Sequence, residues 1–128
     1  MSKTLLVTDD AVIIREMIKD TATQAGWEIV GEASNGQEAI DRYKELRPDA
    51  VTLDMVMPEF DGLHALSGIH EFDPNAKVLV VSALEQTSVL KDAFKRGASD
   101  FLVKPFDRGQ LVKTLETIAS SVDEAAAH

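Results

Sequence analysis

Five short apolar segments alternate with stretches of helical periodicity along this 128-residue chain. Each segment is bounded by polar or turn-forming residues, which is typical of strands that are buried on both faces of a sheet. The segments cover residues 4–8, 28–33, 50–54, 77–82 and 100–104. Because neighbouring parallel strands need a crossover connection, this alternation predicts an α/β fold with a parallel sheet and helices on both faces.

Apolar residues recur at helical spacing after each predicted strand. The first helix presents Val12 and Ile13 among its apolar residues, and Gly26 follows that helix as a stop signal. The fourth helix, over 86–96, is expected to bury Phe94. No linker or repeat interrupts the pattern, so we expect one domain over 1–123 and a frayed tail over 124–128.

The charge and composition exclude several classes of protein. A formal net charge of -9 argues against an isolated nucleic-acid binder, because phosphate contacts need clustered Lys and Arg. No apolar stretch approaches the length needed to span a bilayer, and the N-terminus lacks a signal-peptide pattern. The chain has no cysteine, hence no disulfide framework. We expect a cytoplasmic protein.

Polar side chains follow the carboxyl ends of four predicted strands. The first strand is followed by Asp9 and Asp10, and the others end in Asp54, Ser82 and Lys104. Open parallel sheets bind ligands beyond the carboxyl ends of their strands, near the switch in strand order. Three carboxylates, a hydroxyl and an ammonium group are therefore expected at one edge of the sheet.

Carboxylates that lie close together repel one another unless a cation neutralises them, and Mg²⁺ prefers hard oxygen ligands. Lys104 and Ser82 supply a positive charge and a hydrogen-bond donor for a phosphoryl group, and the Asp54 carboxylate can accept that group as a nucleophile. Each residue alone has an ordinary explanation as a cap, turn or surface residue. Their joint position at matching strand ends favours the functional interpretation.

These residues belong to motifs that resemble a known family. The chain resembles the CheY-like receiver domain of bacterial two-component response regulators, of the stand-alone chemotaxis type. The resemblance implies a flavodoxin-like doubly wound (βα)5 fold with strand order 2-1-3-4-5. The motifs are Asp9-Asp10, Leu53-Asp54-Met55-Val56-Met57-Pro58 with Asp61-Gly62, Ser82-Ala83, and Lys104-Pro105-Phe106.

The resemblance implies a role for each site residue. Asp54 would be the phosphoacceptor, while Lys104 and Ser82 would contact the phosphoryl oxygens. Phe101 would be the switch aromatic, although a Phe in a strand is more often part of the core. The Lys104–Pro105 peptide bond is expected to be cis. The Mg²⁺ ligands would be Asp9, Asp10, Asp54 and the backbone carbonyl of Val56.

The resemblance also implies partners. A histidine kinase would donate the phosphoryl group, and the surface of the fourth helix, fifth strand and fifth helix would signal to a target such as a flagellar motor switch protein. A phosphatase is a further partner. The protein would catalyse only its own phosphorylation and slow dephosphorylation, so it is not a conventional enzyme.

Val56 and Leu84 occupy positions that tune the phosphorylated lifetime in this family. Both are apolar here, and we hypothesise that they exclude water; ordinary loop packing is the alternative. The histidines, His64, His70 and His128, are interpreted as surface residues.

Three other functions compete with the phosphorylation switch. One is a phosphorylation-independent interaction module of the same fold, which the intact Asp9, Asp10, Asp54 and Lys104 oppose. Another is a phosphohydrolase, but Val56 stands where such enzymes need an acid-base Asp. Flavin binding is the third, and the acidic pair after the first strand would repel a flavin phosphate.

Overall fold

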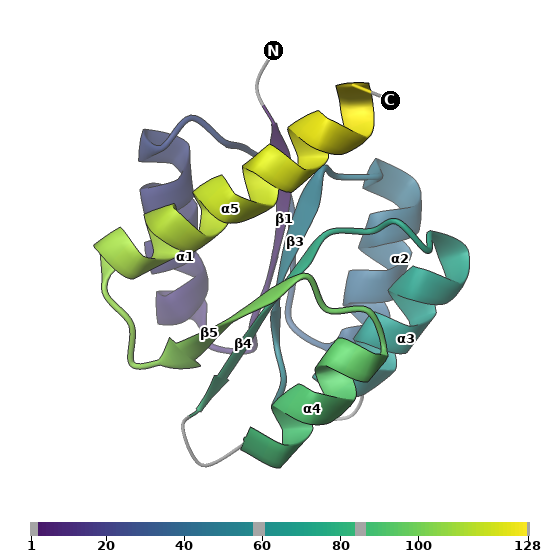
Figure 1. The fold of residues 1–128 in the computed structure, drawn as a ribbon. Helices are drawn as coiled ribbons and strands as arrows, with labels where there is room; N and C mark the ends of the chain where they lie inside the picture. The colour runs from purple at the N-terminus through teal and green to yellow at the C-terminus, as the bar shows by residue number, and fades with distance from the viewer. Residues whose placement is uncertain (1–2, 58–60, 84–86, 128) are drawn as a thin grey trace.

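The computed structural model describes residues 3–57, 61–83 and 87–127. Its elements, in chain order, are β1 (Thr4–Thr8), α1 (Val12–Gln24), β2 (Glu28–Ala33), α2 (Gly36–Leu46), β3 (Ala50–Asp54), α3 (Gly62–Phe72), β4 (Val78–Ala83), α4 (Thr87–Lys95), β5 (Asp100–Lys104) and α5 (Arg108–Ala127). The strands form one parallel sheet in the order β2-β1-β3-β4-β5, which confirms the predicted fold class (Figure 1). The helix α5 continues through Ala127, into the residues expected to form a tail.

The helices cover the sheet in two layers, with α1 and α5 on one face and α2, α3 and α4 on the other (Figure 1). Successive residues of a strand point to opposite faces, so Leu5 and Val7 pack toward α1 and α5, whereas Leu6 packs toward α2 and α3. No helix in the described part of the chain is long and apolar enough to cross a membrane.

Two apolar residues at the start of α1 lie outside the core. Ile13 is 79% exposed and Val12 61% exposed, because α1 turns the face of Ile14, Ile18 and Ala22 toward the sheet. These three are spaced by four residues, so they share one side of the helix.

Two residues of the opposite layer depart from the predictions. Phe94 is 44% exposed, since its neighbour Ala93 occupies the inward position on α4. His70 is predicted at the surface, but its ring is partly buried, with its nitrogens 3.1 Å from the Leu66 carbonyl and 3.2 Å from the Ala76 carbonyl.

Candidate functional site

The strand register brings polar residues together at the carboxyl edge of the sheet. Thr8 pairs with Leu53, so Asp9, directly after β1, and Asp54, the last residue of β3, lie at the same level. Lys104 is the last residue of the edge strand β5, which is separated from β3 by β4. The chain order reverses between β1 and β3, where an open α/β sheet has its ligand-binding crevice.

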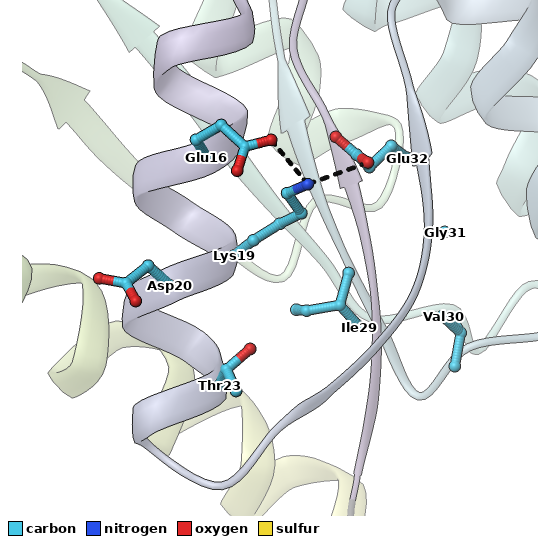
Figure 2. A pocket seen from close by; sticks show the side chains of 8 residues that line it. All are labelled: Glu16, Lys19, Asp20, Thr23, Ile29, Val30, Gly31 and Glu32. Carbon is cyan, nitrogen blue, oxygen red and sulfur yellow. Dashed lines mark ion pairs between the residues drawn. The ribbon is translucent and has the colours of Figure 1, made fainter.

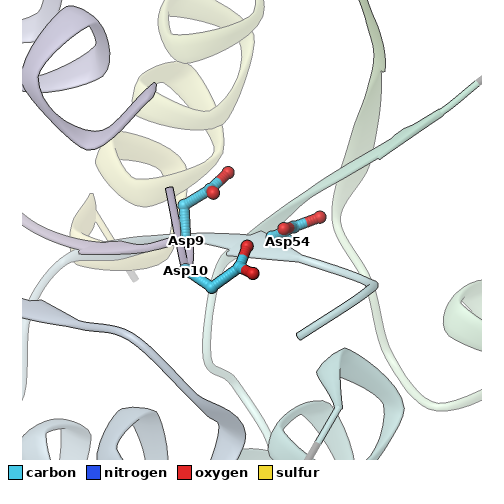
Figure 3. A group of neighbouring side chains, drawn as sticks. All are labelled: Asp9, Asp10 and Asp54. Carbon is cyan, nitrogen blue, oxygen red and sulfur yellow. The ribbon is translucent and has the colours of Figure 1, made fainter. Parts of the chain in front are cut away.

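Three carboxylates meet at this edge (Figure 3). One oxygen each of Asp9, Asp10 and Asp54 can be chosen so that all three atoms lie within 4.8 Å of one another. Asp9 and Asp54 are buried, whereas Asp10 is exposed. The predicted acidic cluster is therefore assembled from the ends of two strands and opens to solvent through Asp10.

Lys104 lies over two of these carboxylates. Its Nζ is 3.0 Å from Asp9 Oδ2 and 3.5 Å from Asp54 Oδ2. The lysine side chain is only partly exposed, so its charge is less screened than that of a surface lysine. One ammonium group thus faces three carboxylates.

The pKa of Asp54 reports this imbalance. Burial and the charge of Asp9 raise it from 3.8 to about 6, and Asp10 contributes in the same direction. Lys104 and a hydrogen bond from the Val56 N–H, 3.3 Å from Asp54 Oδ1, oppose the rise without cancelling it. Negative charge therefore remains in excess, and the oxygen donors are those that Mg²⁺ prefers. The cluster fits a magnesium ion.

The remaining predicted site residues differ in how deeply they are buried. Ser82 is fully buried on β4, and among the described residues its hydroxyl has no hydrogen-bond partner. Val56 is exposed beside the cluster. Leu84 lies outside the described residues. Phe101 is 41% exposed on β5, so its ring points out of the core, where it contacts Phe94 on α4 edge to face at a centroid distance of 5.9 Å.

Two further residues, Arg15 and Gly62, support the site, and only Arg15 carries little signal in the sequence. Arg15 donates from Nη1 to the Asp9 backbone carbonyl at 2.7 Å, although an arginine on a helix usually indicates a solvated face. Gly62 belongs to a recognised motif, and the structure gives the physical reason for it. A Cβ there would lie 2.6 Å from Met55 Cα and equally close to the Asp54 carbonyl oxygen, so only glycine fits.

A second hollow lies away from the acidic edge, between α1 and β2 (Figure 2). It has a volume of about 550 Å³, and Lys19 bridges it with ion pairs of 2.8 Å to Glu16 and 3.1 Å to Glu32. Its other acidic group, Asp20, pairs with Arg108 on α5. This hollow is therefore a structural ion-pair network.

Comparison with known proteins gives consistent matches over most of the chain. The family described as response regulator receiver domain matches residues 5–116. The chemotaxis protein CheY of Thermotoga maritima is 48% identical over 119 residues, which cover 93% of this chain and 99% of that protein. The chemotaxis protein CheY of Listeria monocytogenes is 49% identical over 115 residues, covering 90% of this chain and 97% of that protein.

A solved structure shares the fold. The crystal structure of the CheX-CheY-BeF3-Mg²⁺ complex from Borrelia burgdorferi matches with a TM-score of 0.87 and 37% identity, covering 91% of this chain and 88% of that chain.

Proposed function

Because this chain belongs to the response regulator receiver domain family, we propose that it is a chemotaxis response regulator activated by phosphorylation of Asp54. The observation that carries the proposal is the gathering of three carboxylates within 4.8 Å beneath a lysine that contacts two of them. A receiver domain is a signalling protein and not a classical enzyme. We expect it to act in the cytoplasm.

Of the two buried carboxylates, Asp54 is better placed than Asp9 to act as the nucleophile. Both Asp9 oxygens are engaged, Oδ1 by the Ala11 N–H at 2.9 Å and Oδ2 by Lys104 at 3.0 Å. The Asp54 contacts are longer, at 3.3 Å to the Val56 N–H and 3.5 Å to Lys104. An Asp54 oxygen is therefore freer to attack a phosphorus atom.

In the proposed reaction, an Asp54 oxygen attacks the phosphorus of a phosphohistidine on a histidine kinase. The O–P bond forms as the N–P bond breaks, and the electron pair returns to the imidazole nitrogen. A magnesium ion held by Asp9, Asp10, Asp54 and the Val56 carbonyl would neutralise charge on the phosphoryl oxygens. Lys104 Nζ, already shared between two carboxylates, would turn one N–H toward the phosphoryl group.

The signal would pass from Ser82 to the outer surface. The buried, unpartnered Ser82 hydroxyl would donate to the new phosphoryl oxygens, and Phe101 would move inward from its exposed position. That movement would change the surface formed by α4, β5 and α5. A target such as a flagellar motor switch protein would read the change.

Partner proteins would approach over an apolar rim beside the acidic edge. Val12 and Ile13 are exposed at the start of α1, shortly after the Asp9-Asp10 pair, and Val56 is exposed two residues after Asp54. Exposed apolar side chains beside a reactive site are typical of docking surfaces. We propose that the histidine kinase docks on this rim, and that a phosphatase acts at the same edge. The Borrelia CheY was crystallised with a second protein, CheX.

Val56 would also limit water attack on the phosphorylated form. Its exposed side chain follows Asp54 by two residues, and Leu84 holds the equivalent position after Ser82. Replacing Val56 with Asn and Leu84 with Glu should shorten the phosphorylated lifetime. Unchanged dephosphorylation rates would reduce both residues to loop packing.

The test is phosphorylation by acetyl phosphate with Mg²⁺, followed by intact-mass measurement. The wild type should gain the mass of one phosphoryl group, whereas Asp54→Ala and a sample with EDTA should gain none. Pull-down with and without phosphorylation then separates a switch from a constitutive interaction module. A wild-type protein that stays unmodified while binding its partner would contradict the proposal.

A further inference from the structure

Arg15 contacts the backbone of the acidic loop from the first turns of α1. Its Nη1 lies 2.7 Å from the Asp9 carbonyl oxygen, and its Nε lies 3.1 Å from Glu32 Oε1 on β2. The arginine side chain is only 16% exposed. A guanidinium group that is held at two points of its fork has a fixed orientation. Arg15 therefore joins the edge strand β2 to the loop between β1 and α1.

The carbonyl that Arg15 contacts belongs to the peptide group between Asp9 and Asp10. The orientation of this peptide plane determines where the Asp10 side chain leaves the backbone. In the part of the chain that the structure describes, the Asp10 carboxylate takes part in no hydrogen bond or ion pair. Its position among the three carboxylates therefore depends on the backbone (Figure 3).

The other supports of this loop act on other atoms, although the bond from the Ala11 N–H to Asp9 Oδ1 also closes an Asx turn through this peptide group. The Asp9 N–H bonds to the Ala33 carbonyl at 3.1 Å, and Asp9 Oδ1 accepts from the Ala11 N–H at 2.9 Å. Ala11 is the N-cap residue of α1 and supplies no side-chain cap. Within residues 3–57, 61–83 and 87–127, Arg15 is the side chain that donates a hydrogen bond to the carbonyl between the two acidic residues.

We infer that Arg15 is a positioning residue for the metal site, which holds the Asp9–Asp10 peptide group so that the Asp10 carboxylate completes the cluster. The inference rests on the proposed function, because it assigns Arg15 a role toward the magnesium ion of that site. Glu32 assists by fixing the guanidinium group, and it is itself held by Lys19 at 3.1 Å.

Electrostatics and positioning predict opposite effects of removing Arg15. Deleting a positive charge near three carboxylates would by itself tighten the binding of any cation. Loss of positioning would weaken binding instead, and Mg²⁺ should suffer more than Ca²⁺, since Mg²⁺ demands near-octahedral geometry. The sign of the change therefore separates the two effects.

The experiment is calorimetric titration of the full chain with Mg²⁺ and with Ca²⁺. Arg15→Met should weaken Mg²⁺ binding about tenfold, as is usual for groups that orient a metal ligand, and should weaken Ca²⁺ binding less. Arg15→Lys keeps the charge but cannot reach both acceptors, so it should also bind Mg²⁺ more weakly. Arg42→Met removes an exposed ion pair with Glu45 on α2 and serves as the matched control, with unchanged affinity.

Thermal unfolding in EDTA separates positioning from a structural role. A merely structural Arg15 would lower the unfolding temperature of its variants and leave the Mg²⁺ affinity of the folded protein unchanged, which would overturn the inference. If Arg15→Met does not fold, the Mg²⁺ affinity of Arg15→Lys tests the inference instead. The proposed site itself would be overturned if the wild-type protein bound no Mg²⁺. It would also be overturned if the Asp10→Asn variant bound Mg²⁺ as tightly as the wild type. If the wild type binds Mg²⁺ and Arg15→Lys binds it equally or more tightly, only the role of Arg15 is overturned.

Discussion

The Asp54 carboxyl group combines burial with two neighbouring carboxylates, and both raise its pKa from 3.8 to about 6. The folded protein therefore binds this proton more tightly than the unfolded chain does. By linkage, the contribution of Asp54 to the free energy of unfolding of the metal-free protein falls as the pH rises between 3.8 and about 6. Above that window the folded protein carries an ionised, buried carboxylate that is only partly neutralised by Lys104.

We predict that Asp54→Asn stabilises the metal-free protein at neutral pH. The amide has the shape of the protonated carboxyl but never ionises, so the variant should be about 1 to 3 kcal/mol more stable at pH 7. The difference should vanish below pH 3.8, the ordinary pKa of an Asp. Urea unfolding in EDTA across this pH range measures it. Parallel pH profiles for the two proteins would contradict the prediction.

The Ser82 hydroxyl is buried without a partner among the described residues, as is that of Thr52 on β3. Removing an unpaired buried hydroxyl has little cost in stability. We predict that Ser82→Ala changes the free energy of unfolding by less than about 1 kcal/mol, yet slows phosphorylation by acetyl phosphate about tenfold, because a phosphoryl hydrogen bond is lost.

Thr52→Val is the matched control for Ser82→Ala. It also removes a buried hydroxyl without a described partner, so its stability should change as little, but its phosphorylation rate should stay at the wild-type value. Intact-mass time courses give both rates. Equal slowing in the two variants would mean that Ser82 acts only through packing.

At the scale of elements, α4 and β5 are joined by the edge-to-face contact between Phe94 and Phe101, whose rings meet at 89°. This contact stabilises the exposed position of Phe101, and such a pair contributes about 0.5 to 1.5 kcal/mol. We predict that Phe94→Leu releases Phe101 toward the inward position. Binding of beryllium fluoride with Mg²⁺, a mimic of the phosphorylated form, should tighten between about twofold and tenfold.

The control for Phe94→Leu is Phe72→Leu. Phe72 is a similarly exposed aromatic on α3 and makes an edge-to-face contact with Tyr43 at 6.2 Å, far from Phe101 in the sequence. Its replacement should leave beryllium fluoride binding unchanged. If Phe94→Leu also binds with wild-type affinity, the ring contact has no part in the switch.

The strands were the most predictable elements, because each is a short run, mostly apolar and almost entirely buried in β3 and β4, that is bounded by polar residues where the sheet meets solvent. That is why Asp54 and Lys104 could be placed at one edge before any coordinates. The orientation of helices was less predictable. Val12 and Ile13 continue the apolar character of α1, and only packing shows that the opposite side faces the sheet.

For the whole molecule, the sequence predicts the topology and the site residues. It does not predict the side-chain contacts that join one helix or strand to another. Arg15 reaches a backbone carbonyl and a carboxylate on another element, and neither contact follows from spacing along one helix. The Phe94 contact with Phe101 likewise depends on how α4 lies against the edge strand β5. Side-chain geometry between elements was therefore the part that required the structure.

The proposed signal should change one side of the molecule. Ser82 lies on β4, and Phe101 and Lys104 lie on β5. The helix α4 contacts Phe101 through Phe94, whereas α2 contributes Ile40 to the core. We predict that beryllium fluoride with Mg²⁺ alters amide hydrogen exchange across 87–104 and leaves 36–46 unchanged. Asp54→Asn should show no change in either segment. Equal changes in α2 and α4 would indicate general stiffening by ligand binding, because a local switch must act on the elements that touch it.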